Sequence, residues 1–238
     1  MLGQNFNDLS SYIDFLDKIG DLKRISSEVD PELEISEISS KTIEENGPAL
    51  LFENVKGSSF PVATNLFGSE ERLRLSLGCN PKELGEEILS FAEKAMPPKL
   101  DNLFKSFPFI KRLTNFRSKE QAFNSPCQQI QDEITLEDLP IIKCWPEDGG
   151  KFITMGLTIT ESPISKKPNM GMYRLQMHDK DRLGMHWHPH KGGATHYHEA
   201  RQLGQDFPAA IVLGGDPSLI FAAIAPVSYT HLTLPTKA

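Results

Sequence analysis

The hydrophobic periodicity of the chain changes near its middle, and this change limits the folds that its 238 residues can adopt. Residues 8–95 combine segments of helical period with short apolar runs that are typical of strands. From Ile134 onward, strand patterns dominate. This order predicts an α+β protein in which a small α/β lobe precedes a β-rich one.

The first lobe, residues 1–96, opens with two predicted helices. The first has an apolar face at helical spacing, made by Tyr12, Phe15, Leu16 and Ile19. Gly20 is expected to end it. The second is expected to begin at Pro31 behind the cap Asp30 and to end at Gly47.

Two strands and two further helices complete the predicted lobe. The strands are the segments ALLFENV and FPVATNLF, residues 49–55 and 60–67. The helices follow Ser69 and Asn80, which are expected to cap them. Residues 97–130 contain prolines, a basic excess and no clear period, so we expect a connecting segment whose charges form a solvated face.

The second lobe is predicted over residues 131–227. Its expected strands are KFITMGLTIT, NMGMYRLQMH, RLGMHWHPH and the buried segment AAIVLGG, and the second and third form a hairpin across the turn DKD. A helix is expected over residues 192–204, between the glycine pair and Gly204. Another follows the cap Asp216.

The last eleven residues depart from this pattern. After Val227 the chain continues as SYTHLTLPTKA, which resembles translated sequencing-adapter read-through. We expect residues 228–238 to be non-native and the native protein to continue in their place. A genuine short C-terminal arm is the alternative.

Charge and cysteine content exclude several classes of function. With a net charge of −7, the chain lacks the positive electrostatic potential that general binding to nucleic acids or anionic membranes requires. Three distant cysteines without a CxxC spacing argue against a disulfide framework or a cysteine zinc site and fit a reducing cytosol. The sequence has neither a signal-peptide pattern nor an apolar run of the ~20 residues that span a bilayer. We therefore expect a cytoplasmic protein.

Residues 169–193 gather four of the seven histidines, one of the two tryptophans and Arg174. On a strand, Arg174 shares its face with Met172 and Gln176. If that face points inward, the arginine requires an anion, and its planar fork suits a carboxylate or a phosphate. An outward arginine on a half-exposed sheet is equally compatible with the spacing.

The histidines His186, His188 and His190 alternate, so on a strand they would share a face and could hold a metal. Surface or core-edge histidines explain the same spacing. The amide oxygen of Asn169 suits a hard cation such as Mg or Mn. Lys191 with the two following glycines, at the start of a helix, suggests an anion site, although this motif alone is weak evidence.

The second half of the chain resembles the UbiD family of decarboxylases in three segments, NMGMYRLQ, HWHPHKGG and AIVLGGDPSLIFAAIAP. The first half is similar to the first lobe of that family in two segments, DFLDKIGDLKRISSEVDPELEISEI and PALLFENVKGSSFPVATNLFGS. The resemblance covers nearly the whole chain up to Val227. Among its members, the chain is most similar to those of menaquinone biosynthesis.

The resemblance implies a carboxy-lyase (a lyase) that performs reversible, non-oxidative decarboxylation of aromatic or α,β-unsaturated carboxylic acids, in menaquinone or ubiquinone biosynthesis. It also implies prenylated FMN in a split β-barrel domain, a divalent metal, usually manganese, and often potassium. A flavin prenyltransferase would supply the cofactor, and the full-length form would be a homo-oligomer.

The resemblance also implies roles for particular residues. Asn169 corresponds to the metal-binding asparagine, and His190 is the candidate for the metal-binding histidine. Arg174 corresponds to the catalytic arginine, which also contacts the cofactor. The other implied cofactor contacts are Met172, Tyr173, His186, Trp187, His188, Lys191 and Gly192.

Two parts of the family pattern are missing. The metal-binding glutamate and the catalytic acidic residues of the family lie beyond the segment that ends at Val227, and no acidic residue follows Asp216. We therefore expect this C-terminally truncated chain to be inactive alone. The alternatives are a non-catalytic flavin-binding split-barrel module and a histidine–metal protein without flavin.

Overall fold

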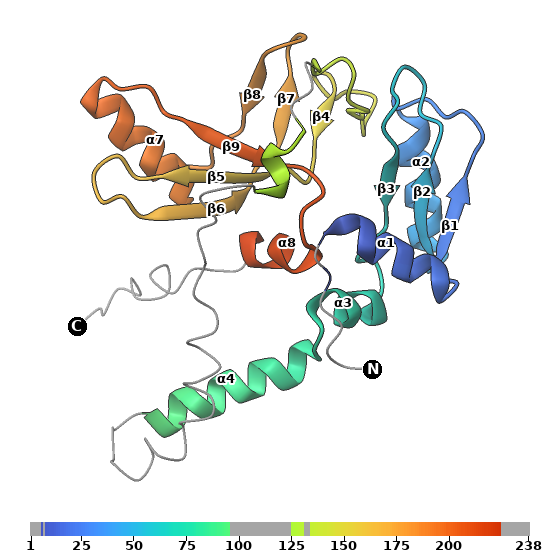
Figure 1. Ribbon diagram of the computed structural model, residues 1–238, viewed down its shortest axis with the longest axis horizontal. Coiled ribbons are helices and arrows are strands. Elements are labelled where there is room, and N and C mark those ends of the chain that lie inside the picture. Colours follow the sequence, from blue (N-terminus) through green and yellow to red (C-terminus); the bar gives the residue numbers. More distant parts are fainter. Residues whose placement is uncertain (1–5, 7, 96–124, 131–133, 225–238) are drawn as a thin grey trace.

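The computed structural model describes residues 6, 8–95, 125–130 and 134–224 (Figure 1). These residues form two lobes of mixed helix and sheet, which confirms the α+β class. The described strands form three separate three-stranded sheets. A closed barrel is not found among them, so the split barrel stays a prediction. The predicted tail at 228–238 and most of the predicted connection at 97–130 lie outside the described residues.

The first lobe is a three-stranded sheet between two helices. Strand β2 pairs in parallel with β1 and in antiparallel fashion with β3. Ala49 packs with Tyr12 and Leu16 on one face, whereas Leu50 and Phe52 pack with Ile35 on the other. The elements are α1 (Leu9–Lys18), β1 (Leu22–Ile25), α2 (Glu34–Glu44), β2 (Ala49–Phe52) and β3 (Val62–Thr64).

Helix α1 is confirmed, with one difference at its end. Asp8 caps it by accepting a hydrogen bond from the backbone N–H of Ser11 at 2.7 Å. Gly20, at φ +78°, follows the helix as predicted. Ile19 was assigned to the apolar face, but it lies past the last turn and is 49% exposed.

The predicted start of α2 is wrong by three residues, and a tertiary contact explains the difference. Leu33 donates a backbone hydrogen bond to Lys143 at 3.0 Å, and Lys143 donates one to Pro31 at 3.0 Å. This parallel bridge pairs Glu32 with Lys143 of a distant segment, and Leu33 after it has a φ of +71°, so the helix begins only at Glu34. Asp30 instead caps a turn, accepting from the N–H of Glu32.

Strand β1 was not predicted. It has only four residues, and the two central ones, Lys23 and Arg24, are exposed. Its backbone is fixed by pairing with the fully buried β2. So short a segment with charged residues at its centre carries little strand signal.

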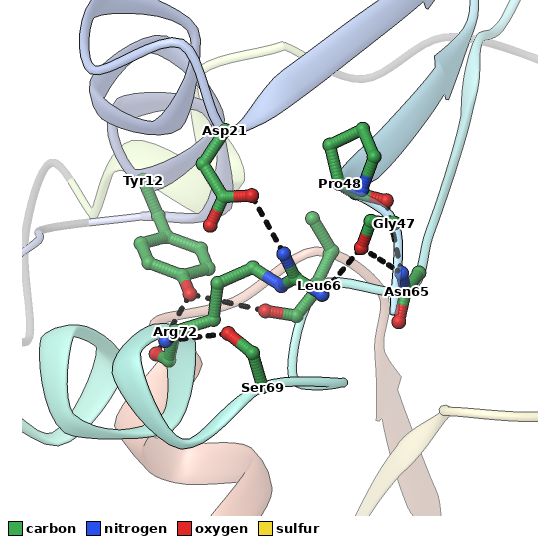
Figure 2. Close-up of polar contacts among 8 residues, drawn as sticks. All are labelled: Tyr12, Asp21, Gly47, Pro48, Asn65, Leu66, Ser69 and Arg72. Atoms are coloured by element: carbon green, nitrogen blue, oxygen red, sulfur yellow. Dashed lines mark hydrogen bonds and ion pairs between the residues drawn. The ribbon is translucent and has the colours of Figure 1, made fainter. Parts of the chain in front are cut away.

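Helices α3 (Glu70–Leu77) and α4 (Pro81–Ala95) confirm the predictions behind Ser69 and Asn80. Helix α3 carries a buried arginine, Arg72, that joins three parts of the lobe (Figure 2). Its guanidinium contacts Asp21 at 2.7 Å and donates to the carbonyl of Gly47 at 3.1 Å. The hydroxyl of Tyr12 donates toward the carbonyls of Leu66 and Arg72. Burial raises the pKa of Tyr12, which keeps this donor protonated.

The second lobe contains two sheets with orders β4-β7-β8 and β6-β5-β9. The predicted hairpin across DKD is confirmed as β7 and β8. Helix α7 packs on the sheet of β5 and β6, and α8 lies between that sheet and the first lobe (Figure 1). The elements are β4 (Phe152–Ile153), β5 (Leu157–Glu161), β6 (Pro168–Met172), β7 (Leu175–Met177), β8 (Leu183–Met185), α7 (Gly192–Leu203), β9 (Ala209–Val212) and α8 (Pro217–Ile224), with a 3-10 turn at Pro126–Gln128.

Two segments that were predicted as single strands are each divided between the two sheets. Residues 151–160 contribute to β4 and β5, with a break at residues 154–156, and residues 169–178 form β6 and β7, with a break at Tyr173 and Arg174. A side chain on Gly156 would meet those of Leu175 and Ile211, so the chain passes here through a tightly packed corner. The breaks bring the two sheets side by side and place Arg174 at their junction.

Helices α7 and α8 are confirmed, and Asp216 accepts a hydrogen bond from the N–H of Ser218 at 2.8 Å. The prediction that β9 is buried is wrong. Among the described strands, it pairs with β5 alone and lies at the edge of its sheet. Its first two residues, Ala209 and Ala210, are exposed, and Leu213 just after it is 49% exposed.

A strap of residues 139–143 joins the lobes. Ile141 is part of the core of the second lobe, with Ile153 and Leu175. Its neighbour Ile142 packs instead against the α2 side of the first lobe. Adjacent side chains of an extended segment point in opposite directions, so the strap contributes to both cores.

Within the described ranges, none of the helices has the length and apolarity needed to cross a membrane.

Candidate functional site

Arg174 lies at the junction of β6 and β7 with its guanidinium held by two neighbours. Its Nη2 contacts Oδ2 of Asp148 at 2.7 Å, and its guanidinium carbon lies 3.8 Å from the centre of the Phe152 ring. The flanking residues Tyr173 and Leu175 are buried, whereas Arg174 and Gln176 share the opposite face, as predicted. The Arg174 side chain is 40% exposed and also paired with an anion, so it is neither a fully inward nor a fully outward arginine.

The partner of Arg174, Asp148, was missed by the sequence analysis. Its side chain is only 13% exposed. The signal that identifies it is an acidic residue before the glycine pair Gly149 and Gly150, directly ahead of a predicted strand. Such a pair allows a tight loop to return along the strand, and the carbonyl of Gly149 accepts a hydrogen bond from Gln176 at 2.8 Å.

An open pocket of about 440 Å³ lies over this face of β7 and β8. Its lining combines a cation, an imidazole, an amide and an aromatic ring, provided by Phe152, Arg174, Gln176, Gly184, Met185 and His186. Two of the predicted site residues, Arg174 and His186, therefore meet in one cavity. A cation beside a flat apolar wall suits a planar organic carboxylate.

The predicted strand over residues 182–190 ends at Met185, so the three histidines do not share a strand face. The side chain of Trp187 packs in an aromatic cluster, where its ring centre lies 4.9 Å from that of Tyr173 and 6.1 Å from that of Tyr197. A turn follows, in which Lys191 donates to the carbonyl of His188. His188 and His190 are exposed, with their rings 5.6 Å apart.

Among the described residues, no group of three or more His, Cys, Asp or Glu side chains is arranged to hold a metal ion. The imidazoles at 186, 188 and 190 therefore do not make a three-histidine site. Asn169 and His190 remain predicted ligands.

The start of α7 gathers another set of predicted residues. Gly193 donates its N–H to the hydroxyl of Tyr173 at 3.0 Å. A β carbon on Gly192 would meet the side chain of Asn169, and one on Gly193 would meet Trp187. The amide nitrogen of Asn169 is buried and has no hydrogen-bond partner among the described residues. The helix start is thus a glycine cradle beside a buried polar atom without a partner.

Lys191 is the N-terminal cap residue of α7 and is exposed, so its charge is added to the positive end of the helix dipole. Met172 ends β6, one residue before Tyr173. The structure therefore brings Asn169, Tyr173, Trp187 and Gly192 together around one helix start.

A further pair of contacts, not predicted, fixes α7 on the sheet. Thr160 on β5 is hydrogen-bonded to Nδ1 of His196 at 3.1 Å. Ser162 donates to Glu199 at 2.6 Å. Both Thr160 and Ser162 are almost fully buried. These contacts hold the helix so that its first turn stays beside Asn169.

We expect Gly193→Ala to destabilise the protein by about 1–3 kcal/mol, because the added methyl group overpacks the contact with Trp187 and Tyr173. Urea unfolding measures the effect. Gly85→Ala in α4 is the matched control, since its β carbon would meet open space. It should stabilise the protein by about 0.5–1 kcal/mol. Equal effects of the two substitutions would contradict the cradle.

Two family profiles match the chain. The profile described as "3-octaprenyl-4-hydroxybenzoate carboxy-lyase N-terminal domain" matches residues 13–92. The profile described as "3-octaprenyl-4-hydroxybenzoate carboxy-lyase Rift-related domain" matches residues 118–233. The two matches correspond to the two lobes.

Solved structures with the same fold include the UbiD-class enzyme HmfF from Pelotomaculum thermopropionicum, in an evolved dimeric form in complex with prFMN. It has a TM-score of 0.73 and 26% identity, over 94% of this chain and 48% of that one. Vanillic acid decarboxylase from Sedimentibacter hydroxybenzoicus has a TM-score of 0.75 and 26% identity, over 95% of this chain and 47% of that one. The chain thus spans about half the length of these proteins.

Proposed function

Because the chain belongs to the UbiD family of carboxy-lyases, we propose that it forms the flavin-binding part of a decarboxylase. The proposed reaction is the reversible, non-oxidative decarboxylation of an aromatic or α,β-unsaturated carboxylic acid. The UbiD-class neighbours, one in complex with prFMN and one a vanillic acid decarboxylase, support this assignment.

One observation carries the proposal: Arg174 lines the pocket with a guanidinium that is already oriented. Asp148 occupies one terminal nitrogen, and the Phe152 ring supports the guanidinium plane. Arginine has five N–H donors, so most remain for a substrate carboxylate. A carboxylate bound here would lie beside the ring of Phe152, which favours a planar substrate.

The residues at the start of α7 fit the phosphate end of prenylated FMN. The glycine cradle allows close approach, and Lys191 and the helix dipole favour an anion. The amide of Asn169, whose nitrogen has no partner in the described part of the chain, is available to a ligand. We assign to Asn169 and His190 the contacts to a divalent ion. The amide oxygen of Asn169 suits a hard ion such as manganese.

When bound, prenylated FMN would supply the electron sink for the carbon–carbon bond to CO₂. The protein's own residues would orient the substrate. Arg174 binds the carboxylate and fixes it relative to the pocket wall. Tyr173 and Trp187 pack edge to face beside the start of α7, where the Tyr173 hydroxyl accepts a hydrogen bond from the N–H of Gly193.

The finer parts of the proposal follow the family resemblance. We propose a role in menaquinone or ubiquinone biosynthesis, manganese with potassium as the ions, and a flavin prenyltransferase as the source of the cofactor.

Carbon dioxide exchange tests the function. The full-length protein, reconstituted with prenylated FMN and Mn²⁺, is incubated with a panel of aromatic and acrylic acids in ¹³C-bicarbonate. We expect the label to enter the carboxyl group of at least one acid, and protein loaded with unmodified FMN to give none. Stoichiometric prenylated FMN with no exchange across the panel would favour the non-catalytic flavin-binding module.

A further inference from the structure

We propose that Asp148 is the positioning residue for Arg174: it fixes the guanidinium so that its free donors face the pocket. This inference rests on the proposed function, in which Arg174 binds the substrate carboxylate. Asp148 does not line the pocket, so its effect on a substrate would be transmitted through Arg174.

Asp148 and Phe152 hold Arg174 from two directions. The carboxylate takes the Nη2 end at 2.7 Å, and the ring lies under the guanidinium at 3.8 Å. The contact with Asp148 restricts rotation of the guanidinium within its own plane, and the contact with the Phe152 ring fixes the orientation of that plane. Both come from a single segment of five residues, so a shift of the segment moves both supports together.

That segment is itself anchored to the strand that follows Arg174. The carbonyl of Gly149 accepts from the side chain of Gln176 at 2.8 Å, and the carbonyl of Lys151 accepts from the N–H of Met177 at 2.9 Å. Asp148 donates its own N–H to Trp145 at 3.1 Å within a turn. The carboxylate therefore sits on a fixed backbone.

Burial makes this ion pair different from those on the surface. Asp148 is 13% exposed, whereas Asp179, which pairs with Arg182 at the tip of the hairpin, is 33% exposed and its arginine is 77% exposed. Exposed pairs contribute little because both side chains remain mobile and solvated. A shielded carboxylate restrains its arginine more strongly.

An opposite role is physically possible for the same contact. As a competing anion, Asp148 would occupy Arg174 and repel the substrate carboxylate. Its removal would then lower KM. As a positioning residue, its removal lowers kcat with little change in KM, because a misplaced arginine still attracts the substrate but no longer aligns it.

The test compares Asp148→Ala with Asp148→Asn, which keeps an oxygen that accepts the Nη2 hydrogen bond. In the reconstituted full-length enzyme, we expect Asp148→Ala to lower kcat by ~10–100-fold and to change KM by less than ~3-fold. Asp148→Asn should recover most of the lost rate. Asp179→Ala is the matched control, since it removes the carboxylate partner of Arg182 at the tip of the β7–β8 hairpin, and it should leave both constants unchanged.

The orientation of Arg174 is measured separately, in crystal structures of the variants without cofactor. We expect the side chain to leave the Phe152 ring in Asp148→Ala and to stay on it in Asp148→Asn. An unchanged kcat, a lower KM, or an unmoved Arg174 in Asp148→Ala would overturn the proposal. If Asp148→Ala does not fold, displacement of Arg174 or complete loss of turnover in the soluble Asp148→Asn variant would overturn it, and retention of both would support it.

The two proposals fail in distinguishable ways. If the wild-type protein binds prenylated FMN but exchanges no CO₂, the decarboxylase function is wrong. The cofactor-free structures still decide whether Asp148 positions Arg174.

Discussion

Replacing Arg174 with lysine is expected to lower the rate of decarboxylation by ~10²–10³-fold, the cost of removing a pre-oriented donor from an active site. Lysine keeps the positive charge but offers a point charge in place of a planar fork. It also cannot hold one oxygen of Asp148 while presenting two parallel donors to a substrate. The loss should appear mainly in kcat, because charge attraction to the substrate persists.

Turnover and CO₂ exchange of the reconstituted enzyme measure this effect, with thermal unfolding as the check on folding. Arg182→Lys is the matched control: it makes the same substitution at the exposed hairpin tip, where Arg182 pairs with Asp179. It should behave as the wild type. Normal turnover of Arg174→Lys would remove the arginine from the mechanism and with it the main support for the proposed function.

Replacing Arg72 with methionine is expected to cost about 3 kcal/mol of folding free energy, at the low end of the range for breaking a buried pair. Arg72 is 2% exposed and is fixed by Asp21 and by the carbonyl of Gly47 (Figure 2). Methionine fills similar space but leaves the Asp21 carboxylate without its cation. The low end applies because Asp21 is 31% exposed and retains some water.

Urea unfolding of the variant measures this cost. Arg74→Met, on the same helix, is the control: Arg74 is 41% exposed and lies 3.6 Å from Glu71, so its removal should change stability by less than about 0.5 kcal/mol. Asp21→Asn should be destabilising too, since it leaves the guanidinium charge buried. If Arg72→Met is no worse than Arg74→Met, the network in Figure 2 contributes little to stability.

Local signals were sufficient to predict most helices. Ser69 and Asn80 precede helices whose first turns they contact, and Gly20 and Gly204 follow helix ends with positive φ. Caps and stops act within a few residues, so they can be recognised in a single sequence. Among the described helices, α2 begins later than its signal predicts, because Glu32, expected in its first turn, pairs instead with Lys143, more than 100 residues away.

Strand predictions failed where long-range packing decides the path of the chain. Gly156 and the residue pair at 173 and 174 interrupt continuous strand patterns, since the second lobe divides them between two sheets. Trp187 leaves the strand pattern for an aromatic group that includes Tyr197 and Phe207. Alternation in sequence reports a preference for strand and not the sheet to which the strand belongs.

The structure brings several of the predicted site residues together, but in two groups and not on one strand face. Arg174 and His186 share a pocket, and Asn169, Tyr173, Trp187 and Gly192 meet at one helix start. The spacing of His186, His188 and His190 suggested that they share one face of a strand, but the strand ends at Met185 and a turn follows. The partner carboxylate Asp148 lies 26 residues before Arg174 in sequence, and its position depends on the loop that returns along β7.

The strap at Ile141 and Ile142 has a thermodynamic consequence. Because each side chain belongs to a different core, melting of either lobe strips apolar cover from the other. The free energies of the two lobes are then coupled, and the junction adds to the cooperativity of unfolding. A swing of one lobe against the other would require at least one of the two isoleucines to leave its core, so the strap opposes bending at the junction of the lobes.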